Sequence, residues 1–244
     1  MRNTLLIARR EFAGYFATPL AYVFIVIFAA TSAAMTFYLG NFLGRGQADL
    51  QPFFAYQPWL HLLLAPAVAM RLWAEERRAG TLELLMTLPV SSTEAVVAKF
   101  AAAWAFTGLA IAATFPMWIT VNVLGDPDNA VITVGYLASF ALSGAFLAIG
   151  GCISALTRNQ VIAYVVSVTI CFLMMLAGLD LVLDAFRAWA PIWFVDTVRG
   201  LSFLTHFQAV SRGVIGLENA VFFVSTVLVW LFATFVAVET TKGR

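Results

Sequence analysis

The sequence predicts an all-α integral membrane protein with six transmembrane helices, built as one membrane domain over residues 1–244. Hydrophobic residues make up 62% of the chain, charged residues only 11%, and the mean hydropathy is +0.90. A soluble fold of this size cannot keep so much apolar surface from water. The length suits six spans of about 20 residues with short connections, and leaves no room for a separate soluble domain.

Six apolar runs mark the expected spans. Six crossings place both termini on the same side of the membrane, and most of the basic residues of the chain fall in or next to the connections on that side. The positive-inside rule therefore predicts that both termini are cytoplasmic. The runs are residues 20–39, 53–73, 96–124, 131–156, 161–183 and 220–238; the basic residues on the cytoplasmic side are Arg2, Arg9, Arg10, Arg71, Arg77, Arg78, Lys99, Arg158, Lys242 and Arg244, against Arg45, Arg187, Arg199 and Arg212 on the other.

Residues 1–18 have the pattern of an amphipathic helix that lies along the membrane surface. Leu5, Phe12 and Tyr15 recur at helical spacing, and the arginines group on a neighbouring face. Pro19 is expected to end this helix and to turn the chain into the first span. The alternative is a first span that simply begins early.

The densest charge cluster of the chain is residues 71–89, of which residues 75–89 form a cytoplasmic segment between the second and third spans. Gly80 is expected to stop one helix and Thr81 to cap a second short helix, which Pro89 ends. Ser91 and Glu94 then have the spacing of a capping box that opens the third span. A short helix held between two caps is more ordered than a flexible loop requires, which suggests that this cytoplasmic segment transmits force.

The same segment carries a cluster of large apolar side chains next to its charges. Exposing each of them to water costs about 1.5–3 kcal/mol, so a groove on a partner protein is expected to cover them. The alternative is a solvated loop. The residues expected to contact the partner are Glu75, Glu76, Arg77, Arg78, Gly80, Thr81, Leu82, Glu83, Leu84, Leu85 and Met86.

Two further features concern packing. Gly144, Ala148 and Cys152 form a small-residue face on the fourth span, which predicts close helix packing either within one subunit or across a dimer.

Residues 184–219 form a connection that is too apolar for a free loop. They predict short re-entrant helices that dip into the outer leaflet, because irregular backbone at that depth must be buried in protein or line a cavity.

The chain lacks the motifs of soluble enzymes: it has no phosphate-binding loop, no His-Glu-x-x-His and no Cys-x-x-Cys. It therefore cannot bind and hydrolyse ATP alone, and its net charge of +1 gives no case for nucleic acid. His61 and His206 are the only histidines, with neither at metal-ligand spacing, and Asp180 lies four residues from Asp184 near the end of the fifth span. A metal site or a proton relay is the functional interpretation of these residues, and packing or solvation is the alternative.

Residues 70–91 resemble the Glu-Glu-x-x-x-Gly-Thr-x-Glu-x-Leu signature of ABC-type-2 transporter permeases, matched here from Glu75 to Leu85. The stretch Arg9, Arg10, Glu11 and Phe12 is similar to the amino-terminal helix of that family. His206 and Phe207, with Arg212 following, resemble the region before the last span in the gliding-motility-associated branch. The permeases of nitrous-oxide-reductase maturation are the alternative branch.

The resemblance implies a non-catalytic permease subunit of an exporter in the bacterial inner membrane. Two permease copies would pair with two separate ATP-binding subunits, which would hold the ATP and magnesium, so no cofactor is expected in this chain. Residues 80–87 would be the coupling helix and residues 2–16 a second contact. The outer residues His206, Phe207 and Arg212 would form a gate or contact an auxiliary subunit with a large external domain.

The substrate class implied by the resemblance includes lipids, polysaccharides, drugs and peptides, and in some branches force is transmitted to an external partner instead. Two other functions stay open from the residues alone. One is a secondary transporter or channel that is not coupled to ATP, for which inverted repeats and buried charges are typical. The other is an intramembrane enzyme, with His61, His206 and Asp180 as its only candidate residues.

Overall fold

The computed structural model describes residues 2–81, 91–187, 190–214 and 216–241, and within these ranges the chain forms helices and turns but no strand. Five helices are long and apolar enough to cross a membrane, and a further apolar helix of 17 residues, Gln160–Leu176, is about 26 Å long. That length lies at the lower limit for a span. The all-α, multi-span class is therefore confirmed. The five candidate spans, three of which are divided by a short turn or a change of helix type, are Leu20–Leu39, Gln51–Ala79, Ser92–Leu124, Asn129–Leu156 and Leu217–Thr240.

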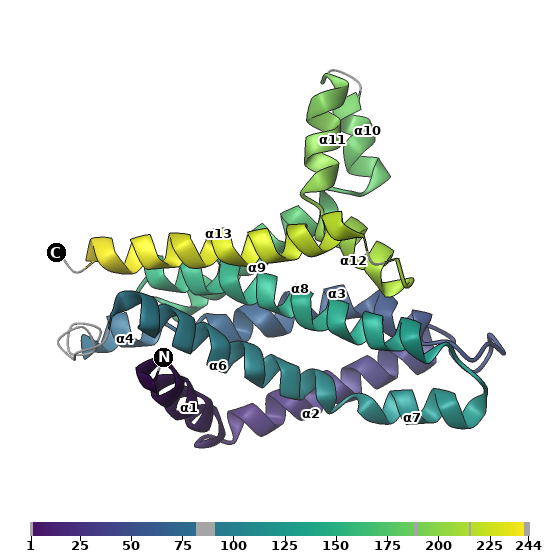
Figure 1. The fold of residues 1–244 in the computed structure, drawn as a ribbon, viewed down its shortest axis with the longest axis horizontal. Coiled ribbons are helices and arrows are strands. Elements are labelled where there is room, and N and C mark those ends of the chain that lie inside the picture. The colour runs from purple at the N-terminus through teal and green to yellow at the C-terminus, as the bar shows by residue number, and fades with distance from the viewer. Residues whose placement is uncertain (1, 82–90, 188–189, 215, 242–244) are drawn as a thin grey trace.

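The long helices run along the longest dimension of the molecule, and α1, α4 and the C-terminal end of α13 lie together at one end (Figure 1). The central helix is α8, which contacts α3, α6, α9, α12 and α13. In chain order the described helices are α1 (Arg2–Phe16), α2 (Leu20–Ala34), η1 (Met35–Leu39), α3 (Gln51–Ala69), α4 (Ala74–Ala79), α6 (Ser92–Ala112), α7 (Phe115–Leu124), α8 (Asn129–Leu156), α9 (Gln160–Leu176), α10 (Asp180–Arg187), α11 (Ile192–Gly200), α12 (Phe203–Ser211) and α13 (Leu217–Thr241).

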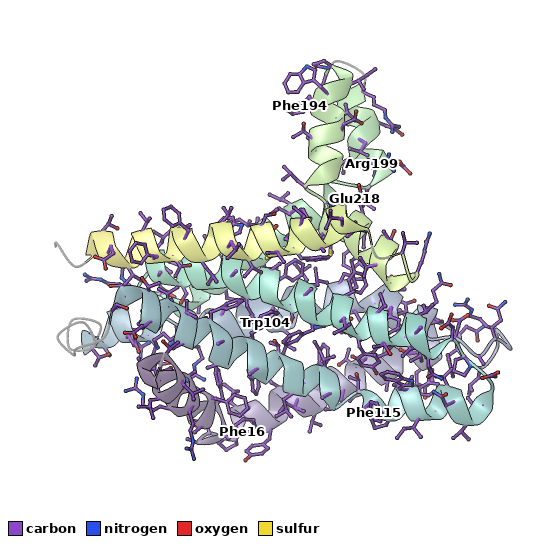
Figure 2. All side chains as sticks on the ribbon, viewed as in Figure 1. Phe16, Trp104, Phe115, Phe194, Arg199 and Glu218 are labelled. Atoms are coloured by element: carbon purple, nitrogen blue, oxygen red, sulfur yellow. The ribbon has the colours of Figure 1, made fainter. Side chains whose placement is uncertain are left out.

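The small-residue face of α8 is buried inside the subunit. A Cβ atom added at Gly144 would lie 2.8 Å from the indole of Trp104, and Ala148 and Cys152 are also buried. Trp104 lies in the middle of the bundle (Figure 2) and stacks on Phe140 with ring centroids 4.4 Å apart. Of the two predicted uses of this face, the structure therefore shows packing within one subunit.

The predicted amino-terminal helix is present as α1, but Pro19 does not end it. The helix ends at Phe16, and Pro19 is the N-cap residue of α2. The α1 helix packs on α6, where Tyr15 stacks on Phe106 at 4.9 Å. Leu5 stays exposed. The apolar side chains of α1 therefore do not share one environment. Tyr15, in the second half of the helix, packs on α6, whereas Leu5, in the first half, faces outward.

Prolines act differently in two spans. Pro66 lies inside α3 without ending the helix, whereas the third span breaks at residues 113–114 and restarts as α7, with Pro116 in its first turn. The hydroxyl of Thr114 donates to the carbonyl oxygen of Ile111 at 2.6 Å and so satisfies part of the broken helix. The third span is therefore interrupted at the turn that precedes Pro116, whereas α3 continues through Pro66.

The predicted end of the fifth span is wrong. Its helix ends at Leu176 instead of Leu183, because the chain turns next to α12: a Cβ atom at Gly178 would lie 2.4 Å from the Ser202 hydroxyl oxygen. Asp180 and Asp184 consequently lie on a separate helix, α10, where both are exposed.

The outer connection forms three short helices, α10, α11 and α12. Figure 1 shows α10 and α11 as a hairpin that projects sideways from the bundle, and Phe194 and Arg199 lie on it (Figure 2). Only α12 packs within the bundle, where Phe203 and Leu204 are buried. The helices were predicted, but the projection of the first two was not.

Candidate functional site

Most of the predicted partner-binding residues that the structure describes gather at the end of the bundle that holds α1 and α4 (Figure 1). Residues 9–12 lie on α1, Glu75 to Arg78 lie on α4, and Gly80 and Thr81 follow directly. The rest of the predicted coupling helix 80–87, including the predicted contacts Leu82, Glu83, Leu84, Leu85 and Met86, lies outside the described residues. The structure therefore describes the two flanks of this segment, which precede residue 82 and follow residue 90.

The α4 helix begins where a side chain of α8 caps it. The backbone N–H groups of Trp73 and Ala74 donate to the hydroxyl oxygen of Ser154 at 3.1 and 3.0 Å, and that hydroxyl donates to the carbonyl of Met70 at 2.9 Å. These N–H groups are among the donors that a helix start leaves unpaired. One serine therefore fixes the start of α4 to the central helix.

The α4 helix ends at Gly80, as the sequence predicts. Gly80 has a φ of +70°, a left-handed conformation that glycine adopts at little cost, and its N–H donates to the carbonyl of Glu76. Glutamates occupy the first turn of α4 and arginines the last turn. This order stabilises a helix, because carboxylates favour its positive N-terminal end and cations its negative C-terminal end.

A buried lysine joins the two predicted contact segments. The Lys99 ammonium, on α6, lies 2.7 Å from the Glu76 carboxylate of α4 and 3.2 Å from the Glu11 carboxylate of α1. It also lies 5.3 Å from the ring centroid of Trp73. The Lys99 side chain is only 3% exposed, and a lysine is almost never so buried unless it is paired. We call Lys99, Glu11 and Glu76 the lysine triad.

The charges around the triad balance. Arg10 binds the Glu11 carboxylate at 2.9 Å, so two cations face two carboxylates. Burial by itself raises the pKa of Glu11, but the positive charge of Lys99 and the hydrogen bonds from Arg10 and Lys99 outweigh this effect and lower the pKa overall. Glu11 is therefore held in its charged form, which the buried ammonium requires.

Further contacts fasten the flanks of the predicted coupling segment. The Arg77 guanidinium donates to the carbonyl of Ala155 at the end of α8, and Arg71 pairs with Glu75 at 3.3 Å. On the other flank, the hydroxyl of Ser92 binds Glu239 near the end of α13. Both flanks of residues 82–90 are therefore attached to the bundle.

The capping box predicted at the start of α6 is confirmed. The hydroxyl oxygen of Ser91 accepts from the N–H of Glu94 at 3.2 Å, and the Glu94 carboxylate accepts from the N–H of Ser91 at 3.1 Å. Together these bonds pair two of the N–H groups that a helix start would leave without partners. The third span therefore begins at a fixed residue directly after the coupling segment.

Sequence reasoning missed the two residues that organise this end. Lys99 was counted only as a cytoplasmic charge, and Ser154 was not singled out. A lysine seven residues into an apolar span is itself a signal, because a charge at that depth needs a partner. Ser154 gave no such signal, since a single serine in an apolar helix is ordinary.

The outer residues predicted as a gate do not share one role. The His206 ring lies between α11 and α13, with Nδ1 2.7 Å from the Asn219 amide oxygen and Nε2 3.0 Å from the carbonyl of Gly200. Phe207 is only 1% exposed and belongs to the core, whereas Arg212 is exposed. In this conformation the side chain of Arg212 is therefore accessible to a partner, whereas that of Phe207 is not.

The other candidate residues for chemistry are separate from one another. His61 is fully buried on α3, with Nδ1 2.8 Å from the carbonyl oxygen of Gln57 and its ring against Phe28. Within the described ranges, no group of three histidine, cysteine or acidic residues is arranged to hold a metal ion. Cys152 and Cys171 are free and buried.

Comparison with known proteins agrees with the multi-pass helical fold. Residues 5–238 match the family model described as ABC-2 family transporter protein. Comparison with curated proteins found no match. Members of the matched family are membrane components of ABC transporters, generally the non-catalytic permeases, and normally work with an ATP-binding subunit. Because the match covers nearly the whole of this multi-pass chain, the protein belongs to the ABC-2 transporter family.

Proposed function

We propose that the chain is the permease subunit of an ATP-driven exporter of the gliding-motility-associated branch. The lysine triad is the observation that carries this proposal. It ties the amino-terminal helix α1 and the charged helix α4 to the third span through one buried ammonium. A movement imposed on α4 therefore acts directly on two other helices, which is what coupling to a separate motor requires.

In the proposed assembly two permease copies face each other in the bacterial inner membrane. Each copy crosses the membrane six times, with the short helix α9 as the fifth span, and both termini are cytoplasmic. Two ATP-binding subunits lie below them and hold the ATP and magnesium. The permease itself holds no cofactor, and its single domain comprises residues 1–244.

The docking surface is proposed to be the coupling segment, residues 75–89. Its apolar residues Leu82, Leu84, Leu85 and Met86 would fill a groove of the ATP-binding subunit, with Glu83 and the exposed Arg78 at the rim. Arg9 on α1, which is also exposed, would form the second contact. Closure of the ATP-binding subunits would then push the flanks of this segment and, through them, α6 and α8.

On the outer side, the projecting hairpin of α10 and α11 is the proposed contact for an auxiliary subunit or for the second permease. Leu181, Ile192 and Trp193 are 69–83% exposed on it, more than an isolated subunit in water would favour. Arg212 is exposed at the C-terminal end of α12, where it lines a pocket with Asp49 and Asp128. Whether a solute moves or only force is transmitted depends on what this face binds.

Affinity purification of the tagged chain from its native membrane tests the proposal. We expect an ATP-binding subunit to remain bound and the eluate to hydrolyse ATP. Leu85→Asp introduces a charge into the proposed groove contact and should remove both the subunit and the ATPase activity. Leu43→Asp makes the same substitution at an exposed position outside the coupling segment and should remove neither.

Two results contradict the proposal. One is a chain that purifies without an ATP-binding subunit under conditions that preserve other transporter complexes. The other is equal retention of that subunit by the wild type and by Leu85→Asp. The first result would favour a channel or secondary carrier that works without ATP, and the second would place the docking surface outside the coupling segment.

A further inference from the structure

A cavity of about 410 Å³ lies at the corner where α1 turns into α2. Its walls come from α1, the beginning of α2, the end of α3, residues 71–75 and one residue of α6. Phe16, labelled in Figure 2, marks the end of α1 at this corner. The volume lies within the range of about 300–1,000 Å³ that small-ligand sites occupy.

One part of the cavity wall is polar and carries both signs of charge. Arg10 and Arg71 line it together with Glu75 and Tyr15. Arg71 binds Glu75 through Nε, and among the described residues no hydrogen bond occupies its two terminal nitrogens. The hydroxyl of Tyr15 likewise makes no hydrogen bond to the described part of the chain. Donors and a carboxylate therefore remain available to a ligand.

Most of the other lining residues are apolar. Ala21 and Phe24 of α2, Val68 of α3 and Phe106 of α6 are among them. From there the outer surface of α2 continues as exposed apolar side chains, including Val23 and Val26. The cavity is therefore polar on one side and apolar on the other, and its apolar side opens toward a surface suited to hydrocarbon chains.

We propose that this cavity binds one aminophospholipid, a lipid whose headgroup carries a phosphate and a primary ammonium. The phosphate binds Arg71 and Arg10, the ammonium binds Glu75, and the first part of one acyl chain lies against Phe24 and Val68. Arginine and phosphate form strong charge-assisted hydrogen bonds. A polar mouth above an apolar wall, at the junction of an amphipathic helix and a span, matches the polarity of a lipid at the membrane interface.

The charge pattern selects the headgroup. Glu11 also lines the cavity, but the lysine triad already engages its carboxylate, whereas the side chain of Glu75 is about half exposed. Glu75 can therefore accept from an ammonium while its partner Arg71 donates to the phosphate. A phosphatidylglycerol has no amine for Glu75, and a phosphatidylcholine has no N–H to donate. This inference does not depend on the proposed ATP-binding partner.

Native mass spectrometry of the purified, delipidated chain in detergent tests the proposal. The chain is titrated with phosphatidylethanolamine, phosphatidylglycerol and phosphatidylcholine of identical acyl chains. We expect one tight equivalent of phosphatidylethanolamine. Arg71→Ala should weaken its binding about tenfold, the effect of losing one hydrogen bond to a charged group. Glu75→Gln should reduce the preference for phosphatidylethanolamine over phosphatidylglycerol.

Two further variants control for unfolding and for charge. Gly14→Leu should block the cavity, because Gly14 lines it and an added Cβ atom would meet no atom within 4 Å, so the fold need not shift. Arg158→Ala removes an equal charge from an exposed position after α8, outside both the cavity and the proposed docking surface, and should change the affinity less than twofold. Thermal unfolding of each variant verifies that the fold is retained.

Three results would overturn the proposal. The first is equal affinity of the wild type, Arg71→Ala and Gly14→Leu for phosphatidylethanolamine, which would indicate unspecific lipid around the spans. The second is the absence of any preference among the three lipids. The third is competition by glycerophosphoethanolamine, the headgroup without acyl chains, at the same concentration as the whole lipid, which would make the cavity a site for a water-soluble ligand.

Discussion

Replacing Lys99 by methionine removes the ammonium of the lysine triad but keeps an unbranched side chain of similar length. Glu11 and Glu76 then face each other without a cation between them, and one oxygen of Glu76 is already buried without a hydrogen bond within the described part of the chain. Removing one partner of a buried ion pair costs about 3–5 kcal/mol. Both carboxylate side chains are 22% exposed, so the lower end of that range applies.

An independent upper limit on the stability lost with the Lys99 ammonium has a similar value. The protein can avoid the unpaired charge by protonating one carboxylate, and at pH 7 this costs about 3.7 kcal/mol for a glutamate with an ordinary pKa near 4.3. We therefore expect Lys99→Met to lose about 3 kcal/mol of stability. For a chain of this size the loss corresponds to a melting temperature lower by roughly 6–12 °C.

The two free cysteines provide the assay. Cys152 and Cys171 are buried, so a thiol-reactive fluorophore in detergent solution reports their exposure as the protein unfolds on heating. Arg78→Met removes an exposed charge from α4 and should stay within about 0.5 kcal/mol of the wild type. The double variant with Glu76→Gln should recover part of the loss. A melting temperature of Lys99→Met within 2 °C of the wild type would refute the triad as a structural link.

Three more predictions follow from the same end of the molecule. Ser154→Ala leaves the N–H groups at the start of α4 buried without an acceptor, so the same thiol assay should show a loss of about 2–3 kcal/mol. Gly80→Ala forces an alanine into left-handed backbone and should cost about 1 kcal/mol, seen as faster amide exchange at the end of α4. Because the pKa of folded Glu11 is lowered, its contribution is complete above the ordinary carboxyl pKa and is lost as the pH falls below that value and through the lowered pKa of the folded state. The melting temperature measured by tryptophan fluorescence should therefore fall less between pH 6 and pH 3 in Glu11→Gln than in the wild type.

The sequence predicted the features that depend on neighbouring residues. The first span, the start of α8 near residue 131, the stop at Gly80 and the capping box at Ser91 all lie where the apolar runs and capping patterns place them. Hydropathy and caps act within one helix, so a single sequence contains the information that determines them.

Features that depend on distant residues were not predictable in this way. The pairing of Lys99 with Glu11 spans 88 positions and the capping of Ala74 by Ser154 spans 80. The early end of α9 likewise depends on the approach of Ser202, a residue of another element. Each of these contacts is determined by how the helices pack, and hydropathy cannot distinguish one packing from another.

The attachments of the coupling segment bear on how force would reach the spans. Its first flank is bound to α8 through Ser154 and to α6 through Lys99, and its second flank is bound to α13 through Ser92. A load applied to residues 82–90 in the proposed complex would therefore act on three helices that already contact one another. Because packed helices shift as units more readily than they bend, the expected response is a rigid displacement of α6, α8 and α13 together. The first span makes fewer contacts with this group, so the relative motion is expected between α2 and the group, at the corner that contains the cavity.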